Sequence, residues 1–200
     1  MTYDLRSFVK HWPFVFLMAL LGAVVAVLIS FTQPIKFSSS ARILITQNNI
    51  SGLDPYTAIK STERIAASLS ELVYTSSFMQ AILLGAPGFD QAYFPTDEYK
   101  RRQAWQKTLA VSISPGTGIM SVAVYHPKRS EAHLLVESVV RELVRQAPNY
   151  FGYNVRAQEI DTALDSPWIA KPAFLKNAVF GFLIGLLLGM GWVLLKSSRR

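Results

Sequence analysis

The sequence predicts an α+β domain, a ferredoxin-like β-α-β-β-α-β sheet with one extra helix, placed between two transmembrane helices. Two runs without any charged residue, 12–31 and 177–195, lie near the ends of the 200-residue chain. Each has about the 20 residues that span a bilayer as a helix. Between them, strand and helix patterns follow the order of a split βαβ fold. The composition, 50% hydrophobic and 16% charged, excludes a disordered chain and disfavours an ordinary soluble domain.

The first apolar run predicts a transmembrane helix over 12–31, after a cytoplasmic tail formed by residues 1–11. A cleaved signal peptide is the alternative, because Arg6 and Lys10 precede the run as they would in a signal. Signal peptides have roughly 7–15 apolar residues and a nearby small-x-small cleavage site. This run is longer and no such site follows it closely, so we expect a retained helix.

The segment 32–177 is expected to form the external domain. Its first strand is predicted at 41–47, where the residues are apolar and β-branched. Turn-forming residues over 48–55 predict a loop. Apolar residues then recur at helical spacing over 56–73, and a short second helix is predicted to begin with Ser76 as its N-cap.

The middle of the domain contains the clearest local pattern, a β-hairpin. A helix is predicted over 96–108 with Thr96 as its N-cap. Alternating strands at 109–114 and 119–125 then flank the turn sequence Pro-Gly-Thr-Gly.

The last part of the domain supplies a long helix and a final strand. The helix is predicted to run from its N-cap Ser130 to about Ala147 and to be ended by Pro148 and Gly152, because proline interrupts helical hydrogen bonding. A weaker pattern predicts a strand over 155–160. In the resulting sheet the first and last strands are antiparallel neighbours, so both ends of the domain leave it on the same side.

The second transmembrane helix, predicted over 178–195, carries the most specific motif in the chain. Gly181, Gly185 and Gly189 form a tandem G-x-x-x-G, which places three glycines on one helix face and allows another helix to approach closely. The first helix offers small residues as a partner face. The spacing leaves open whether the face packs within one chain or between chains. The small residues of the first helix are Ala19, Gly22, Ala23 and Ala26.

Charge predicts the topology. The formal net charge is +7, of which the tails 1–11 and 196–200 supply +4 and the central segment +3. Basic tails favour the cytoplasmic side, which places both termini in the cytoplasm and the domain in the periplasm or outside the cell. A nucleic-acid partner is disfavoured, because Lys100-Arg101-Arg102 is the only basic run and is typical of a solvated helix face.

The residues that could carry chemistry do not form a catalytic or metal site. The chain has no cysteine, which excludes disulfides and thiolate chemistry. His126 and His133 have no third ligand at suitable spacing. Asp161 and Asp165 could pair as general acid and base, but we expect solvated loop carboxylates. The sequence therefore predicts no catalytic residue, no metal and no cofactor, and hence no enzyme.

Four aromatic residues around the second half of the domain allow two interpretations. They could stack on a sugar, or they could belong to the hydrophobic core, which is the more common role at such spacing. We expect core packing. The residues are Tyr93, Phe94, Tyr99 and Trp105.

The layout resembles the bacterial polysaccharide co-polymerases, the chain-length determinant (Wzz-type) family. The resemblance rests on the lead-in Tyr3–Trp12, the strand 37–45, the hairpin 111–122 with Tyr125-His126-Pro127, the proline segment 163–172 and the glycine-rich helix. It covers nearly the whole chain. It implies that Pro167 and Pro172 form the family's juxtamembrane proline motif, which would stiffen the link between domain and helix because proline fixes φ. A plain juxtamembrane linker is the alternative for these two prolines.

The resemblance implies an oligomeric scaffold in the bacterial inner membrane. Such proteins regulate the chain length of O-antigen, capsule or exopolysaccharide together with a polymerase, and some pair with a cytoplasmic tyrosine kinase. The five-residue tail 196–200 has no P-loop, which excludes a built-in kinase and disfavours activation of a separate one. A membrane-anchored sensory or adaptor protein with an external binding domain is the alternative.

Overall fold

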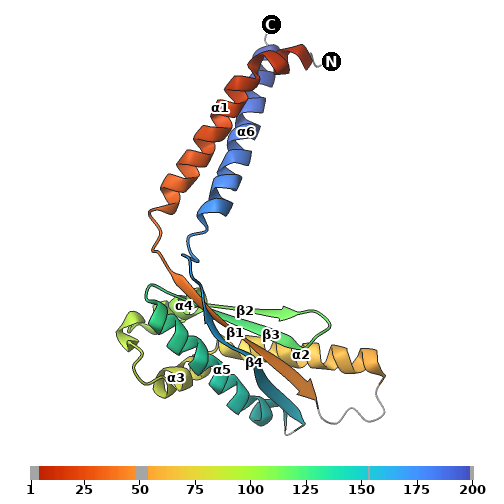
Figure 1. The fold of residues 1–200 in the computed structure, drawn as a ribbon, viewed down its shortest axis with the longest axis vertical. Helices are drawn as coiled ribbons and strands as arrows, with labels where there is room; N and C mark the ends of the chain where they lie inside the picture. Colours follow the sequence, from red (N-terminus) through yellow and green to blue (C-terminus); the bar gives the residue numbers. More distant parts are fainter. Residues whose placement is uncertain (1–4, 48–53, 153, 199–200) are drawn as a thin grey trace. The chain divides into compact units, whose positions relative to one another are not determined.

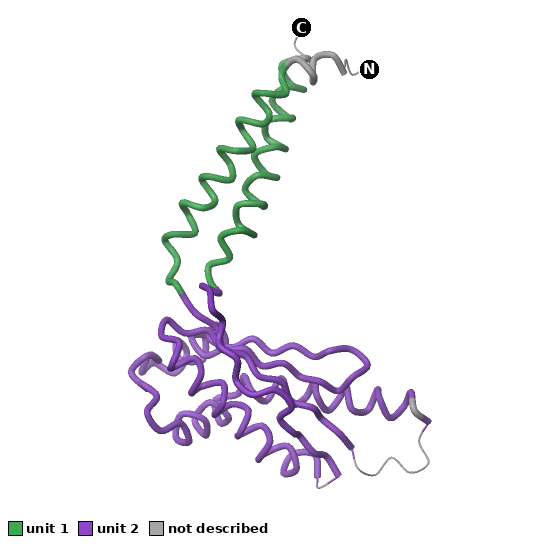
Figure 2. The backbone as a smooth tube through the Cα atoms, in the orientation of Figure 1, with its two compact units in different colours: residues 1–35, 171–200 green, residues 36–170 purple. Residues whose placement is uncertain are grey.

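The computed structural model describes residues 5–47, 54–152 and 154–198 of the chain. Most of the predicted loop 48–55 and the outer ends of both tails lie outside these residues. The chain divides into two compact units, one formed by residues 1–35 with 171–200 and the other by residues 36–170 (Figure 2).

The first unit is a pair of long helices, α1 (Leu5–Ser30) and α6 (Phe174–Ser198), which lie side by side (Figure 1). Both contain a segment long and apolar enough to cross a membrane, His11–Ser30 with 20 residues and Phe174–Lys196 with 23. Two such helices are compatible with a two-pass membrane protein. Both helices begin earlier than the predicted spans, so part of the predicted tail 1–11 is helical.

The second unit is built on a four-stranded antiparallel sheet. Its strands are β1 (Phe37–Gln47), β2 (Leu109–Ser114), β3 (Ile119–His126) and β4 (Val155–Asp165), in the spatial order β2-β3-β1-β4. The predicted class, an α+β chain with two apolar terminal helices, is confirmed.

The first and last strands of the sheet are neighbours. Because β1 and β4 are antiparallel, β1 begins at the end of the sheet where β4 finishes. Two backbone hydrogen bonds continue this pairing beyond the strands: Ser166 N donates to Ser38 O at 2.7 Å, and Ala170 N donates to Lys36 O at 2.9 Å. The chain therefore enters and leaves this unit at adjacent points.

One face of the sheet carries the hydrophobic core. The helices α2 (Pro55–Val73) and α5 (Arg129–Phe151) contact each other and the strands, and they bury the alternate residues of β1 and β3. Ile43, Val122 and Leu135 are fully buried there. The opposite strand positions, such as Ser40 and Arg42, stay exposed, which is the pattern of a sheet covered on one side.

Two shorter helices complete the core, α3 (Ser76–Gly85) and α4 (Glu98–Thr108), with the 3₁₀ turn η1 (Gln91–Tyr93) between them. Trp105 of α4 is buried, and its indole Nε1 donates to Val73 O at 2.8 Å. This bond satisfies the only polar atom of the indole, which allows the large ring to lie inside the core.

The helix starts differ from the predictions by one or two residues. Thr75 rather than Ser76 caps α3, with its hydroxyl accepting from Phe78 N at 3.4 Å. Asp97 rather than Thr96 caps α4, and its carboxylate accepts from Lys100 N at 2.9 Å. The N-cap position of α5 is Lys128, not Ser130, and its side chain forms no cap bond.

The strand and helix ends also correct three predictions. β1 begins at Phe37 rather than 41, because its serine-rich start pairs with β3. β4 continues to Asp165 rather than 160, because pairing with β1 satisfies its backbone although its outer half is exposed. Pro148 lies inside α5 instead of ending it, and the helix stops before Gly152, whose φ is +82°.

The predicted β-hairpin is confirmed as β2 and β3. Its turn depends on glycine at Gly118, where φ is +67° and an added Cβ would lie 2.8 Å from the Ile45 carbonyl oxygen. Ile45 N also donates to Gly118 O at 3.0 Å, which fixes the hairpin tip against β1.

Candidate functional site

The three predicted glycines of α6 lie directly against α1. A Cβ added at Gly185 would lie 2.9 Å from the Cα of Ala19, and one at Gly189 would lie 3.0 Å from the Cα of Val15. A Cβ at Gly181 would collide with the carbonyl of Gly22. In this structure of a single chain the glycine face packs against α1.

Gly191 lies on the same helix but does not contact the described part of α1. A Cβ built there would meet no neighbouring part of the described chain within 4 Å. The close approach of the helices therefore depends on the four-residue spacing of Gly181, Gly185 and Gly189, not on glycine content alone.

The facing surface of α1 is also made of small residues. Ala19 is fully buried, Gly22 would bring a Cβ to 3.1 Å from the Cα of Gly185, and Ala26 faces Gly181. Small side chains on both helices bring the backbones together and create dispersion contacts that lipid chains do not replace. Ala23 is half-buried, and none of its atoms is among those nearest the three glycines of α6.

A polar contact joins the two helices where the apolar runs end. Asn177 Nδ2 donates to Ser30 Oγ at 2.7 Å, and Ser30 Oγ donates to the Ala26 carbonyl at 2.8 Å. Ser30 is 1% exposed. The rings of Phe31 and Phe174 pack beside each other with centroids 5.1 Å apart. Sequence reasoning missed the Asn177–Ser30 pair, although both residues stand at the ends of the uncharged runs.

The outward faces of both helices are apolar and exposed. Such surfaces on a helix pair fit contact with lipid chains, which need no polar partner. The exposed large residues include Phe16, Leu17, Leu20, Leu21, Val24, Leu28, Phe180, Leu183, Ile184, Leu187, Leu188 and Leu195.

The two predicted prolines belong to different units of the chain. Pro167 lies after β4, and its carbonyl accepts a hydrogen bond from Arg129 Nη2 at 2.6 Å. The Arg129 guanidinium also lies 4.6 Å from the centre of the Phe37 ring, a cation–π contact. Pro172 follows a cis peptide bond, and its carbonyl accepts from Phe174 N at 3.0 Å.

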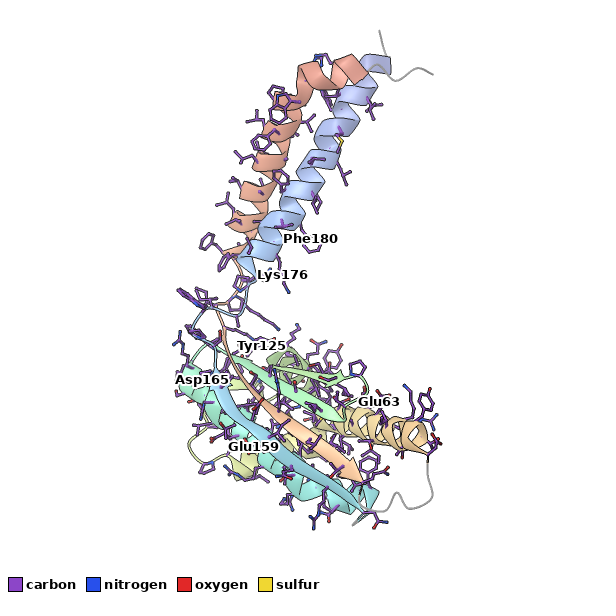
Figure 3. The ribbon with its side chains drawn as sticks, turned by 45° about the vertical axis from the view of Figure 1, so that its right-hand side comes forward. Glu63, Tyr125, Glu159, Asp165, Lys176 and Phe180 are labelled. Atoms are coloured by element: carbon purple, nitrogen blue, oxygen red, sulfur yellow. The ribbon has the colours of Figure 1, made fainter. Side chains whose placement is uncertain are left out.

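A second polar contact, between His133 and Asp165, joins the end of β4 to α5. His133 Nδ1 lies 3.0 Å from Asp165 Oδ1, and its Nε2 lies 3.3 Å from Glu137 Oε1. The hydrogen bond to Asp165 raises the pKa of His133 above its usual value of 6.5, with Glu137 adding to the effect. Figure 3 labels Asp165 on β4. Sequence reasoning did not find this pair.

The titratable residues considered for chemistry meet in one pair, His133 with Asp165, and neither the two histidines nor the two aspartates form the pairs considered from the sequence. Asp161 pairs with Arg42 at 3.5 Å and Asp165 with His133, so the two carboxylates have separate partners. Both lie on β4, not in the loop that was predicted. His126 is buried at the end of β3, and burial lowers its pKa. Within the described residues no three His, Asp or Glu side chains are placed to hold a metal ion.

Three of the four aromatic residues lie in the core or pack against it, as expected, and the fourth, Tyr99, does not. Phe94 and Trp105 are 5% and 1% exposed, so neither is available to stack on a sugar. Tyr93 packs edge-on against His126, with ring centroids 4.2 Å apart. Tyr99 is exposed on α4.

The uncovered side of β1 and β4 contains a hollow of about 320 Å³ with a mixed polar and apolar lining. It lies where irregular pairing separates the two strands between Ser40 and Arg42. Its charged residues are Arg42 and Asp161. The remaining lining residues are Ser40, Thr162, Ala163 and Leu164.

Comparison with known proteins gives no relative from which a role could be inferred. No protein-family model matches the sequence, and no curated protein matches it.

Proposed function

We propose that this chain is a two-pass membrane scaffold that regulates the chain length or export of a surface polysaccharide together with a polymerase. The polymer would be an O-antigen, a capsule or an exopolysaccharide. The proposal requires no cofactor and no catalytic residue, because a scaffold acts by assembly and positioning.

The observation that carries the proposal is the insertion of one α+β domain between two membrane-compatible helices that pack through small residues. Neighbouring strands β1 and β4 bring both connections to one end of the sheet. The order β4-β1-β3-β2, with α2 and α5 on one face, supports a ferredoxin-like assignment. The same layout, with its proline segment and glycine-rich second helix, underlies the resemblance to the co-polymerases.

The proposed location is the bacterial inner membrane, with both termini in the cytoplasm and the domain in the periplasm. Basic residues in the tails support this orientation, since positive charge near membrane helices favours the cytoplasmic side.

We further propose a homo-oligomer. Because Gly181, Gly185 and Gly189 contact α1 of the same chain, subunits would meet through the outward helix faces or the sides of the domain. We include no tyrosine kinase in the proposal.

Deletion of the gene followed by gel electrophoresis of the cell's surface polysaccharide tests the proposal. We expect the deleted strain to lose its characteristic chain-length distribution, and a plasmid copy of the wild-type gene to restore it. An unchanged length distribution in the deleted strain would refute the polysaccharide role while leaving the membrane assignment intact.

The hollow beside β4 favours one alternative, a sensory or adaptor protein whose external domain binds a small ligand. Arg42 and Asp161 offer both charges to such a ligand. In that case Arg42→Ala would abolish a response to the ligand, and deletion of the gene would leave polysaccharide length unchanged.

A further inference from the structure

We propose that the connection after β4, residues 166–170, is a lipid-docking element whose Trp168 and Ile169 insert into the interfacial region of the bilayer. This inference rests on the two-pass membrane part of the proposed function and is independent of the polysaccharide role. The partner is the membrane surface beside the chain's own transmembrane segments.

The connection exposes an unusual amount of apolar surface. Trp168 is 79% exposed and Ile169 43% exposed, and Leu164 near the end of β4 is 74% exposed. Trp105, by contrast, is 1% exposed in the core. Removing such side chains from water is favourable, and several exposed large apolar residues close together in the sequence are typical of a surface that contacts a membrane or another protein.

Although Trp168 is exposed, its backbone is held in place. Ser166 Oγ donates to Trp168 O at 2.8 Å, and Trp168 N donates to Ser166 Oγ at 3.4 Å. On either side, Arg129 donates to Pro167 O and Ala170 N donates to Lys36 O. A segment already fixed in this way loses little conformational entropy on docking.

Chain connectivity identifies lipid as the partner. Trp168 precedes Phe174, the first residue of the apolar span, by six residues. Six residues reach at most about 20 Å, so the ring cannot lie farther than that from the start of the apolar span. Tryptophan is enriched at the membrane boundary because its apolar ring and its N–H suit the headgroup region.

Nearby basic residues add electrostatic attraction to anionic headgroups. Lys171 and Lys176 follow Trp168 by three and eight residues, and Lys36 is hydrogen-bonded through its backbone to Ala170. Cations next to an apolar anchor strengthen binding to anionic membranes.

The test uses the full chain in nanodiscs of phosphatidylcholine and phosphatidylglycerol, with lipids brominated on the upper acyl carbons as the quencher. Trp12→Phe with Trp192→Phe removes the tryptophans of the helix pair and leaves Trp105 and Trp168. We expect brominated lipid to remove most of the Trp168 emission, taken as the difference from the same protein carrying Trp168→Phe. Quenching should be stronger for bromine near the headgroups than for bromine at the acyl ends.

Tyr56→Trp, introduced together with Trp168→Phe in that background, is the matched control. Tyr56 is 70% exposed in the first turn of α2, which follows the far end of β1. A strand of 11 residues places that end about 35 Å from the start of β1. We expect no lipid quenching at position 56.

Three results would overturn the proposal. Trp168 emission could remain unquenched by lipid while staying accessible to aqueous acrylamide, which means that nothing covers the ring. It could remain unquenched by lipid yet be protected from acrylamide, which means that a protein surface covers it. Quenching at position 56 equal to that at 168 would also overturn it. The difference in quenching between the wild-type chain and the chain carrying Trp12→Phe with Trp192→Phe separately reports whether the helix pair contacts lipid.

Discussion

Two side chains from the first turns of α5 hold the end of β4. Arg129 binds the Pro167 carbonyl and His133 binds the Asp165 carboxylate. The outer half of β4 is exposed and contributes little to the core, so apolar packing alone holds it weakly. These polar contacts therefore determine how firmly the last strand stays in the sheet.

The His133 contact predicts a pH dependence of stability. The pKa of His133 is raised in the folded chain, so its contribution is full below the unfolded value near 6.5 and is lost as pH rises through the folded value. His133→Gln should remove this dependence. Because the His133–Asp165 pair is partly exposed, we expect the free energy of unfolding to change by no more than about 1 kcal/mol. Denaturant unfolding of the full chain in detergent, on both sides of the raised pKa, measures it.

Asp165→Asn provides the control for that prediction. It should return the pKa of His133 toward its usual value, as followed by NMR titration, without removing the imidazole. An identical pH slope of unfolding in the wild-type and His133→Gln chains would contradict the prediction.

Local chemistry predicted some residues and not others. The glycines of α6 were visible because their period is a property of one helix. The caps of α3 and α4 were misplaced by one residue because Thr75 and Ser76, like Thr96 and Asp97, are adjacent residues that can both cap. The contact between His133 and Asp165 joins positions 32 residues apart and depends on how far β4 extends, so no local pattern revealed it.

The packing of α1 against α6 leaves no room for a side chain at the three glycines of α6. Gly185→Leu should force the helices apart, because even a Cβ there would lie 2.9 Å from the Ala19 backbone. Overpacking of this kind costs about 1–3 kcal/mol. Cysteines introduced at Ser30 and Asn177, whose side chains are hydrogen-bonded, should then crosslink less efficiently on oxidation. The chain has no native cysteine to interfere.

Gly191→Leu is the matched control, since a side chain there meets no neighbouring part of the described chain within 4 Å. It adds the same volume to the same helix and should leave crosslinking unchanged. Equal yields in the Gly185→Leu and Gly191→Leu chains would show that the glycine face does not set the helix approach.

Helices and strands were predictable where burial of one face makes apolar residues recur at a regular spacing in the sequence. The helix α2 and the hairpin β2–β3 carry apolar residues at helical and alternating spacing, and both agree with the structure. The second half of β4 lacks such a period because it is exposed, and its strand geometry comes from pairing with β1. Its length therefore depends on a partner more than 100 residues earlier in the sequence.

For the whole molecule, the charge of the tails predicts the orientation in the membrane. Cysteine at Tyr56 should react with a membrane-impermeant thiol reagent when the inner membrane is intact. Cysteine at Lys196 should react only after the membrane is opened. Both positions are exposed in the structure, so a difference in labelling reports the side of the membrane. The reverse pattern would contradict the proposed orientation.

The fold class followed from the sequence, whereas the function did not. Two uncharged runs and one alternating hairpin are strong physical patterns, since bilayer thickness and sheet pleating impose them. The proposed scaffold role would leave no comparable pattern, because it would need surfaces and not reacting groups. Asp161 and Asp165 illustrate this: their spacing allowed an acid–base pair, and the structure gives each a different partner.

The adjacency of β1 and β4 has a mechanical consequence. Because the domain is entered and left at neighbouring strand ends, a force that separates Lys36 from Ala170 loads one hydrogen bond at a time, as in a zipper. Opening would begin at Ala170, pass Ser166 and travel toward Val155, while β2 and β3 remain paired. The domain should therefore yield at low force to lateral separation of its two attachment points, through loss of a single strand.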